Sequence, residues 1–190
     1  MILLDVEADN LLEDATLIHC LSYTSDGKNY QTIFDYQEMR DFILKQKGLI
    51  GHNIIRYDIP LLEKILGIKV KARLFDTLPM SWVLNYSRAK HGLETFGVDF
   101  DIPKPEISDW SGLTKEEYQH RCVEDVKINW LLWRNLLKRF LYIYDNDKAL
   151  LDKFFRYLEF KMDCAFAAEA SGWKLDVALA TKSFDEVTRQ

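Results

Sequence analysis

The first seven residues, MILLDVE (Met1–Glu7), form an apolar run that leads directly into two acidic residues. Such a run is typical of a buried strand. Because side chains alternate along a strand, Asp5 and Glu7 point to the same face at its end. Two adjacent carboxylates repel one another, and a hard divalent cation such as Mg²⁺ or Mn²⁺, which prefers oxygen ligands, offsets that repulsion. The pair therefore indicates a metal site. The alternative is a pair of ordinary surface acids at a strand edge.

A second candidate site lies in the segment 51–63, GHNIIRYDIPLLE, which follows a short apolar pair. This pattern predicts a strand that ends in a loop, and then a helix that starts near Asp58 with Pro60 in its first turn. Asp58 can cap that helix, which is the commoner role of an isolated Asp, or reach a metal. Asn53 offers an amide to a sugar or to a base edge. The acidic pair of the first strand favours metal binding by Asp58 over helix capping.

The third acidic position is Asp125, in a segment with helical periodicity at 116–133. One stripe of this helix carries Cys122, Val126, Asn129 and Trp133. Asp125 therefore borders a buried face. His120 lies five residues earlier, and a histidine so placed can deprotonate an attacking water because its unperturbed pKa is near neutrality. A lone histidine on a helix is more often a plain surface residue.

As a set, these residues resemble the DEDD superfamily of 3′→5′ exonucleases. Its three motifs carry an Asp-x-Glu, an Asn followed by an Asp, and a final Asp preceded by Tyr or His. The segments between the motifs are similar to the proofreading domain of family A DNA polymerases of short-tailed phages. Those segments are Phe75–Leu78, His91–Gly97 and Asp109–Ser111, and the opening Met1–Leu12 is similar as well. The resemblance covers about residues 1–140.

The third motif departs from the tyrosine subtype of this superfamily, which has Tyr four residues before the final Asp, where this chain has Arg121. His120 fits the spacing of the histidine subtype, in which the histidine is the general base, and we assign that role to it. Tyr118, about two helical turns from Asp125, is the weaker candidate. If neither acts, the site would bind metals and cut slowly, or would only hold a strand end.

The resemblance implies a site for two divalent cations, Mg²⁺ or Mn²⁺, held by Asp5, Glu7, Asp58 and Asp125. These acids and His120 are the expected catalytic residues. One ion generates the nucleophile and the other stabilises the departing 3′ oxygen, so that nucleoside 5′-monophosphates are released. By the resemblance, Asp5 and Asp125 hold the nucleophile-side ion with help from Glu7, Asp5 also bridges to the second ion, and Asp58 acts largely through water.

Substrate contacts are expected from Asn53 and from apolar side chains that wedge or stack the terminal bases. The apolar candidates are Leu11, Tyr57 and Phe96, with core packing as the alternative for each. The expected substrate is a single-stranded or frayed DNA 3′ end. We expect the chain to act as the proofreading part of a family A DNA polymerase.

Two other functions stay open. The first is exoribonuclease activity, because the same metal site cuts RNA and discrimination depends on a contact to the 2′-hydroxyl. The second is a degenerate, non-catalytic module that binds nucleic acid or a polymerase, which Arg121 keeps open.

The composition agrees with an exonuclease domain. A chain of 190 residues with 48% hydrophobic content has room for one ordinary domain and an appendage. A net charge of −5 argues against a general nucleic-acid coat protein, which binds phosphates through Lys and Arg. The three cysteines are expected to be reduced and buried. No signal peptide or membrane-spanning run is visible, so we expect a soluble, intracellular protein without a membrane partner. The resemblance implies a phage-encoded protein in the host cytoplasm, and we expect a monomer.

The expected fold class is α/β, a ribonuclease-H-like mixed sheet flanked by helices, with a helical extension at the C-terminus. Strands are expected at 18–23 and 30–34, joined by a hairpin turn at 25–29, with a helix at 36–47 and a strand from 49. Residues 1–145 form the expected exonuclease domain.

Residues 146–190 are expected to form a helical segment, with one long helical pattern at 150–172. The segment from Glu159 is similar to the start of the polymerase region of family A enzymes. The polymerase domain is then a partner in cis, within a longer chain, or in trans. Polymerase activity is not expected here.

Overall fold

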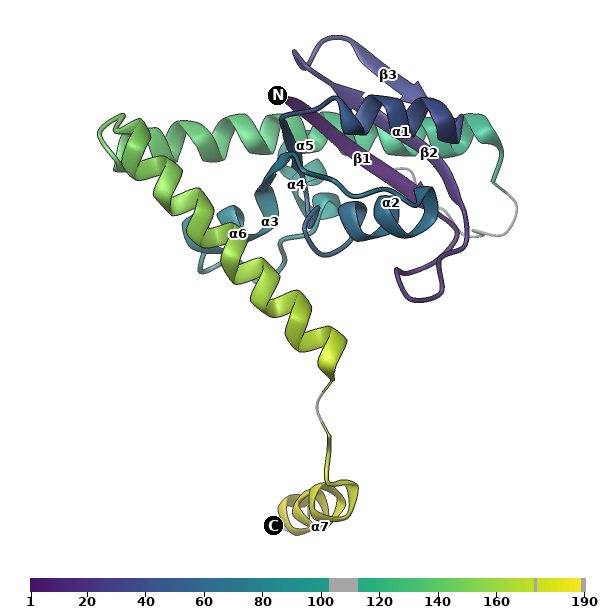
Figure 1. Ribbon diagram of the computed structural model, residues 1–190. Helices are drawn as coiled ribbons and strands as arrows, with labels where there is room; N and C mark the ends of the chain where they lie inside the picture. The colour runs from purple at the N-terminus through teal and green to yellow at the C-terminus, as the bar shows by residue number, and fades with distance from the viewer. Residues whose placement is uncertain (103–112, 173, 189–190) are drawn as a thin grey trace.

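The computed structural model describes residues 1–102, 113–172 and 174–188. Its centre is a five-stranded mixed sheet in the order β3-β2-β1-β4-β5, with helices on both faces (Figure 1). The strands are β1 (Ile2–Ala8), β2 (Ile18–Thr24), β3 (Tyr30–Ile33), β4 (Gly48–Gly51) and β5 (Arg73–Asp76). The helices are α1 (Tyr36–Leu44), α2 (Asp58–Leu66), α3 (Thr77–Leu84), α4 (Leu93–Asp99), α5 (Lys115–Ile143), α6 (Lys148–Ser171) and α7 (Val177–Thr188).

Strand β1 is the middle strand, antiparallel to β2 and parallel to β4. Its side chains alternate between two cores. Leu4 and Val6 belong to the core that α1 and α2 cover, whereas Leu3 belongs to the core that contains the buried side chains of α5. Asp5 and Glu7 therefore share the Leu3 face, and they point toward α5.

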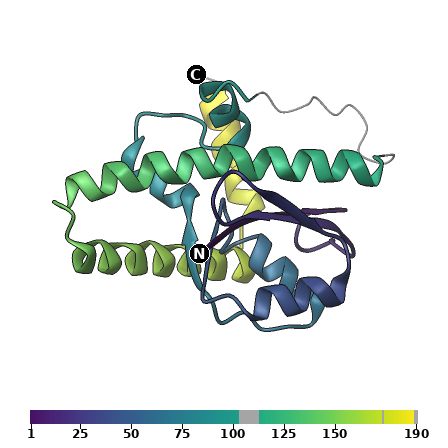
Figure 2. The same ribbon diagram turned by 90° about the horizontal axis from the view of Figure 1, so that it is seen from above.

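Helix α5 runs across β1 and β2 on that face (Figure 2). Its start is fixed by a capping box, in which the Thr114 side chain accepts from the Glu117 backbone N–H and the Glu117 carboxylate accepts from the Thr114 backbone N–H. Its buried stripe includes Val126, Leu132 and Leu136. This stripe holds the helix against the sheet, and the residues near its start extend toward the acidic end of β1.

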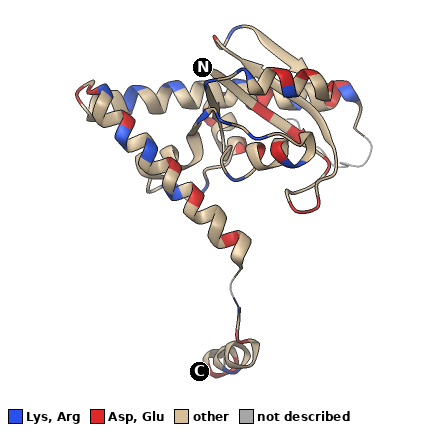
Figure 3. Ribbon diagram, viewed as in Figure 1, with Lys and Arg blue, Asp and Glu red and all other residues tan. Residues whose placement is uncertain are grey.

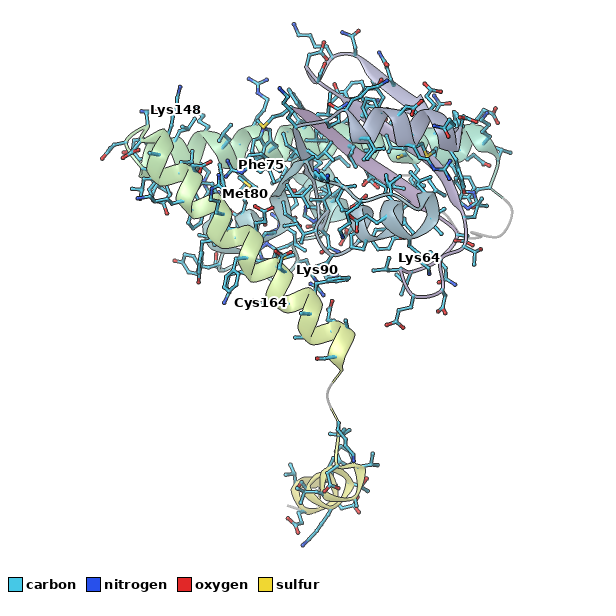
Figure 4. The ribbon with its side chains drawn as sticks, in the orientation of Figure 1. Lys64, Phe75, Met80, Lys90, Lys148 and Cys164 are labelled. Carbon is cyan, nitrogen blue, oxygen red and sulfur yellow. The ribbon has the colours of Figure 1, made fainter. Side chains whose placement is uncertain are left out.

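Helix α6 turns back from α5 and packs on the sheet edge. Phe155 is 9% exposed and meets Phe75 of β5 edge-on, with ring centroids 5.5 Å apart (Figure 4 labels Phe75). Arg73 of β5 pairs with Asp152. Helix α7, in contrast, buries no residue and lies away from the sheet in Figure 1. The assignment of residues 146–190 to the start of a polymerase domain stays a prediction.

The expected hairpin, the mixed sheet and the long C-terminal helix are all present. Helix α1 ends at Leu44 and not at Lys47, because the chain must turn before β4 begins at Gly48. The short elements β5, α3 and α4 were not anticipated. The segment Asp109–Ser111, which contributed to the family resemblance, lies outside the described residues. None of the described helices is long and apolar enough to cross a membrane.

The packing of α6 predicts a sharp difference between two phenylalanines on that helix. Phe155→Ala is expected to lower the free energy of unfolding by about 3–5 kcal/mol, because it leaves a cavity between β5 and α5. Phe160→Ala is the matched control, since Phe160 is 61% exposed, and its cost should stay within about 0.5 kcal/mol. Urea unfolding of both variants measures the difference, and equal costs would mean that α6 does not pack as described.

Candidate metal centre

Three carboxylates meet where β1 passes under α5. One oxygen from each of Asp5, Glu7 and Asp125 lies within 4.8 Å of the others. Asp5 and Glu7 come from alternate positions of β1, and Asp125 comes from the face of α5 that borders the core. Figure 3 shows acidic residues on β1. The sequence prediction that these three residues come together is thus met by the geometry.

Asp58 lies at the first position of α2 and is 3% exposed. It lines the same cavity of about 460 Å³ as the other three acids. The helix cap is Tyr57, so Asp58 does not take the capping role that was its alternative. Burial raises the pKa of Asp58 well above its ordinary range, against hydrogen bonds from backbone N–H groups, and the nearby Asp76 raises it further.

Asp76 fixes the loop that carries Asp58 and Asn53. Its carboxylate accepts from the backbone N–H groups of Asn53 at 2.8 Å, Ile55 at 3.3 Å and Leu78 at 3.0 Å, and it also caps α3. Burial raises the pKa of Asp76 to about 6, and these hydrogen bonds oppose the rise. Asn53 adopts a left-handed backbone with φ of 61°. Sequence reasoning placed Asp76 in a family segment but gave it no role.

Arg121 enters the cavity from α5 and pairs with Glu7. Its Nε donates to Glu7 Oε1 at 2.9 Å, and the two side chains are 18% and 12% exposed. A guanidinium stays protonated at all ordinary pH values, so it cannot act as the general base. It can partly balance the acids, and it can bind a phosphate.

The loop between β1 and β2 brings Leu11 to the rim of the cavity. Asp9 holds this loop, since its carboxylate accepts from the Thr16 hydroxyl at 2.6 Å and from the Leu17 backbone N–H at 3.0 Å. The Tyr57 hydroxyl donates to the Asn10 carbonyl at 2.9 Å. Leu11 is left 75% exposed on this loop. Its role as a wedge for a terminal base stays a prediction.

The remaining site candidates are not all at the cavity. Asn53, Leu11 and Tyr57 line it, as does His52, which sequence reasoning missed although it directly precedes Asn53 after a strand. Phe96 lies in the core that includes the buried side chains of α5. His120 is exposed on α5 and is not among the lining residues of the cavity. Its assignment as the general base stays a prediction.

The donor set fits hard divalent cations. All four acidic side chains offer oxygen, and Mg²⁺ and Mn²⁺ prefer oxygen ligands. Buried or half-buried carboxylates this close together repel strongly, and the ion pair between Arg121 and Glu7 offsets one charge. Asp5, Glu7, Asp58 and Asp125 are therefore the residues that would hold the ions.

Replacing Arg121 with Gln should strengthen metal binding, because the guanidinium competes with a cation for Glu7. At an effective dielectric constant near 20, a unit charge at about 4 Å interacts by about 4 kcal/mol, so we expect Mn²⁺ affinity to rise at least about fivefold. Calorimetric titration at low salt measures this. Arg88→Gln, which breaks an ion pair with Asp99 elsewhere, is the matched control. Weaker Mn²⁺ binding by Arg121→Gln would mean that the arginine orients Glu7 and does not compete for it.

Asp58→Asn should flatten the pH dependence of stability in the presence of a chelator. The folded protein keeps the Asp58 proton to a higher pH than the unfolded chain, which releases it near pH 4, so stability falls as pH rises above 4 toward the raised pKa. We expect the variant to gain more than about 1 kcal/mol relative to wild type between pH 5 and pH 8. Urea midpoints at the two pH values measure this. Asp76 is present in both wild type and the variant, so its titration cancels in the comparison. If stability changed with pH equally in the two proteins, the burial of Asp58 would be contradicted.

Neither the protein-family models nor the curated proteins match this sequence. Solved structures match in fold. Brucella melitensis NrnC has a TM-score of 0.65 at 19% identity, over 93% of this chain and 90% of that chain. It has also been solved with bound Mg²⁺ and bound to pGG.

Two further similar structures carry a nuclease description. Escherichia coli RNase D, an exoribonuclease involved in structured RNA processing, has a TM-score of 0.56 at 16% identity, over 85% of this chain and 44% of that chain. Exonuclease X in complex with 5′ overhanging duplex DNA has a TM-score of 0.51 at 13% identity, over 73% and 91%. The predicted fold class is confirmed: the chain has the ribonuclease-H-like fold of DEDD exonucleases, a mixed sheet flanked by helices with a helical C-terminal extension.

Proposed function

We propose that this chain is a metal-dependent 3′→5′ exonuclease that releases nucleoside 5′-monophosphates. The observation that carries the proposal is the meeting of Asp5, Glu7 and Asp125 within 4.8 Å, with the buried Asp58 lining the same cavity. Fold likeness to exonuclease X and to the exoribonuclease RNase D supports it. Leu11 lines this cavity and is 75% exposed, so its side chain is accessible to a strand end.

The four acids would hold two divalent cations, which supply a nucleophile at neutral pH and stabilise the charge on the leaving oxygen. Leu11 and Tyr57 contact the terminal base from the rim of the cavity. Asn53 presents its amide to the terminal sugar, and among the described residues its buried Oδ1 has no hydrogen-bond partner. An unsatisfied buried acceptor favours a ligand hydroxyl, because leaving it unpaired costs about 1–3 kcal/mol.

We retain His120 as the general base of this reaction. It lies on α5 next to Arg121, one residue away from the cavity lining, and it is exposed to water. Catalytic hydrogen bonds are often long or misaligned without substrate and shorten in the complex. Arg121, which lines the cavity with the acids, can then bind the phosphate that is attacked, because a guanidinium matches phosphate geometry.

We propose DNA 3′ ends as the substrate and proofreading for a family A polymerase as the role, in keeping with the sequence segments that resemble such domains. RNA is the second candidate. The observation that favours it is the match to NrnC over nearly the whole of both chains, since NrnC has been solved bound to pGG, together with the match to RNase D. Asn53 is the residue placed to meet a sugar hydroxyl.

The test is digestion of 5′-labelled DNA and RNA single strands of one sequence with Mg²⁺ or Mn²⁺. Wild type should shorten its substrate stepwise from the 3′ end, and a chelator should stop it. Asp5→Asn should lower the rate at least about a hundredfold, because it removes a metal ligand, whereas the exposed Asp41→Asn should not. His120→Gln should lower the rate about a hundredfold or more, and the exposed neighbour Gln119→Ala should not.

Each outcome separates the alternatives. Strand binding without shortening in Mn²⁺ would leave only the non-catalytic module. Shortening that His120→Gln leaves intact would remove the base assignment and keep the exonuclease. A preference for RNA over DNA would overturn the proofreading role, and faster removal of a 3′ mismatch than of a paired end would support it.

A further inference from the structure

We propose that a second hollow, beside the acid cluster, binds a nucleobase of the strand whose 3′ end is being cut. This hollow, called the stacking hollow below, is lined by His19, Phe34, Leu113, Lys115 and Tyr118 and has a volume of about 350 Å³. The inference rests on the proposed exonuclease function. It assigns a role to residues that the reaction itself does not use.

The rings of the stacking hollow are already ordered. His19 of β2 and Tyr118 of α5 stack with ring centroids 3.7 Å apart and planes inclined by 9°. Tyr118 is buried, so the stack is anchored in the protein. The side-chain entropy of these rings is therefore lost on folding and not on binding. Stacking of a base on an aromatic side chain contributes about 1–3 kcal/mol and tolerates any base. The pKa of His19 is lowered by burial, which keeps the ring neutral and suited to stacking.

A cation lies next to these rings. The Lys115 Nζ is 3.9 Å from the centroid of the Phe34 ring, where the ring face attracts it. Lys115 is the first residue of α5 and is exposed, so its ammonium group can reach a phosphate without losing much of its solvation. Aromatic faces next to a single cation are the two components that single-strand sites combine.

The position of the hollow is set by the same elements as the metal centre. Phe34 follows β3 and His19 lies at the start of β2, next to Cys20, which pairs with Glu7 of β1. On α5, Tyr118 lies one turn before Arg121 and two turns before Asp125, which is about 10 Å along the helix. A strand with its 3′ end at the acids can therefore continue along α5 and place an earlier base in the hollow.

This placement changes the role of Tyr118. As a candidate general base, Tyr118 lies two turns from Asp125 and is buried against His19. As part of a stack it needs neither a proton to transfer nor an approach to the metals. The hollow then contributes to binding of longer strands and leaves the cleavage step unchanged. Loss of the hollow should therefore weaken the binding of long strands and leave that of a dinucleotide unchanged.

The experiment compares a dinucleotide with a seven-nucleotide strand of the nucleic acid that wild type degrades. His19→Leu removes the ring, and His19→Phe keeps it as the matched control. Lys115→Gln removes the exposed cation without touching the core, and Lys28→Gln on the β2–β3 hairpin is its control. For the longer strand we expect His19→Leu and Lys115→Gln to raise KM at least about fivefold with kcat unchanged. For the dinucleotide we expect kcat/KM to stay within about twofold, and the two controls to behave as wild type.

Equal changes for both lengths, or none for either, would overturn the stacking hollow while the exonuclease stands. Wild type that shortens neither strand would overturn the proposed function instead. In that case fluorescence anisotropy of a labelled seven-nucleotide strand in chelator decides the hollow separately. At least a fivefold loss of affinity in both variants supports it, and unchanged affinity overturns it.

Discussion

Repulsion among carboxylates at one end of the sheet is the constraint on which this structure depends. Asp5, Glu7 and Asp125 lie within 4.8 Å of one another, and Asp58 is buried in the same cavity. Unit charges about 4 Å apart repel by about 4 kcal/mol at an effective dielectric constant near 20, so the fold must offset this cost. It does so by pairing Glu7 with Arg121 and by raising the pKa of Asp58, and divalent cations are proposed to supply the rest.

Helix α5 makes this arrangement possible. Its apolar stripe is fixed on the sheet, and its first turns reach beyond the core to the acidic end of β1. The same turns carry Tyr118, Arg121 and Asp125 in sequence. The proposed nucleobase hollow, the arginine that balances the acids and a proposed metal ligand are therefore held on one rigid helix. The loop before α2 is fixed separately, by hydrogen bonds from the backbone N–H groups of Asn53 and Ile55 to the Asp76 carboxylate, which also accepts from the Leu78 N–H of α3. Two supports of different kinds, a packed helix and a buried carboxylate, thus position the cavity.

Local pattern was enough to predict the parts of the site that depend on periodicity. Alternation along β1 put Asp5 and Glu7 on one face, and the stripe of α5 put Asp125 at the border of the core. Contacts between distant residues were not predictable in this way. Arg121 and Glu7 are 114 positions apart, and the role of Asp76 depends on a loop more than twenty positions earlier. The elements β5, α3 and α4 are too short for periodicity to identify them. Phe96, predicted as a stacking residue, lies in the core, because sequence alone does not show which side of a short helix is covered.

The central claim is that the four carboxylates form a centre for two divalent cations. Anomalous diffraction from crystals of the wild-type chain grown with Mn²⁺ tests it most directly. The account predicts two manganese peaks about 4 Å apart, with Asp5 next to both and Asp125 next to one. Saturating Mn²⁺ that gives no peak in the cavity, or a single peak touched by neither Asp5 nor Asp125, would contradict it.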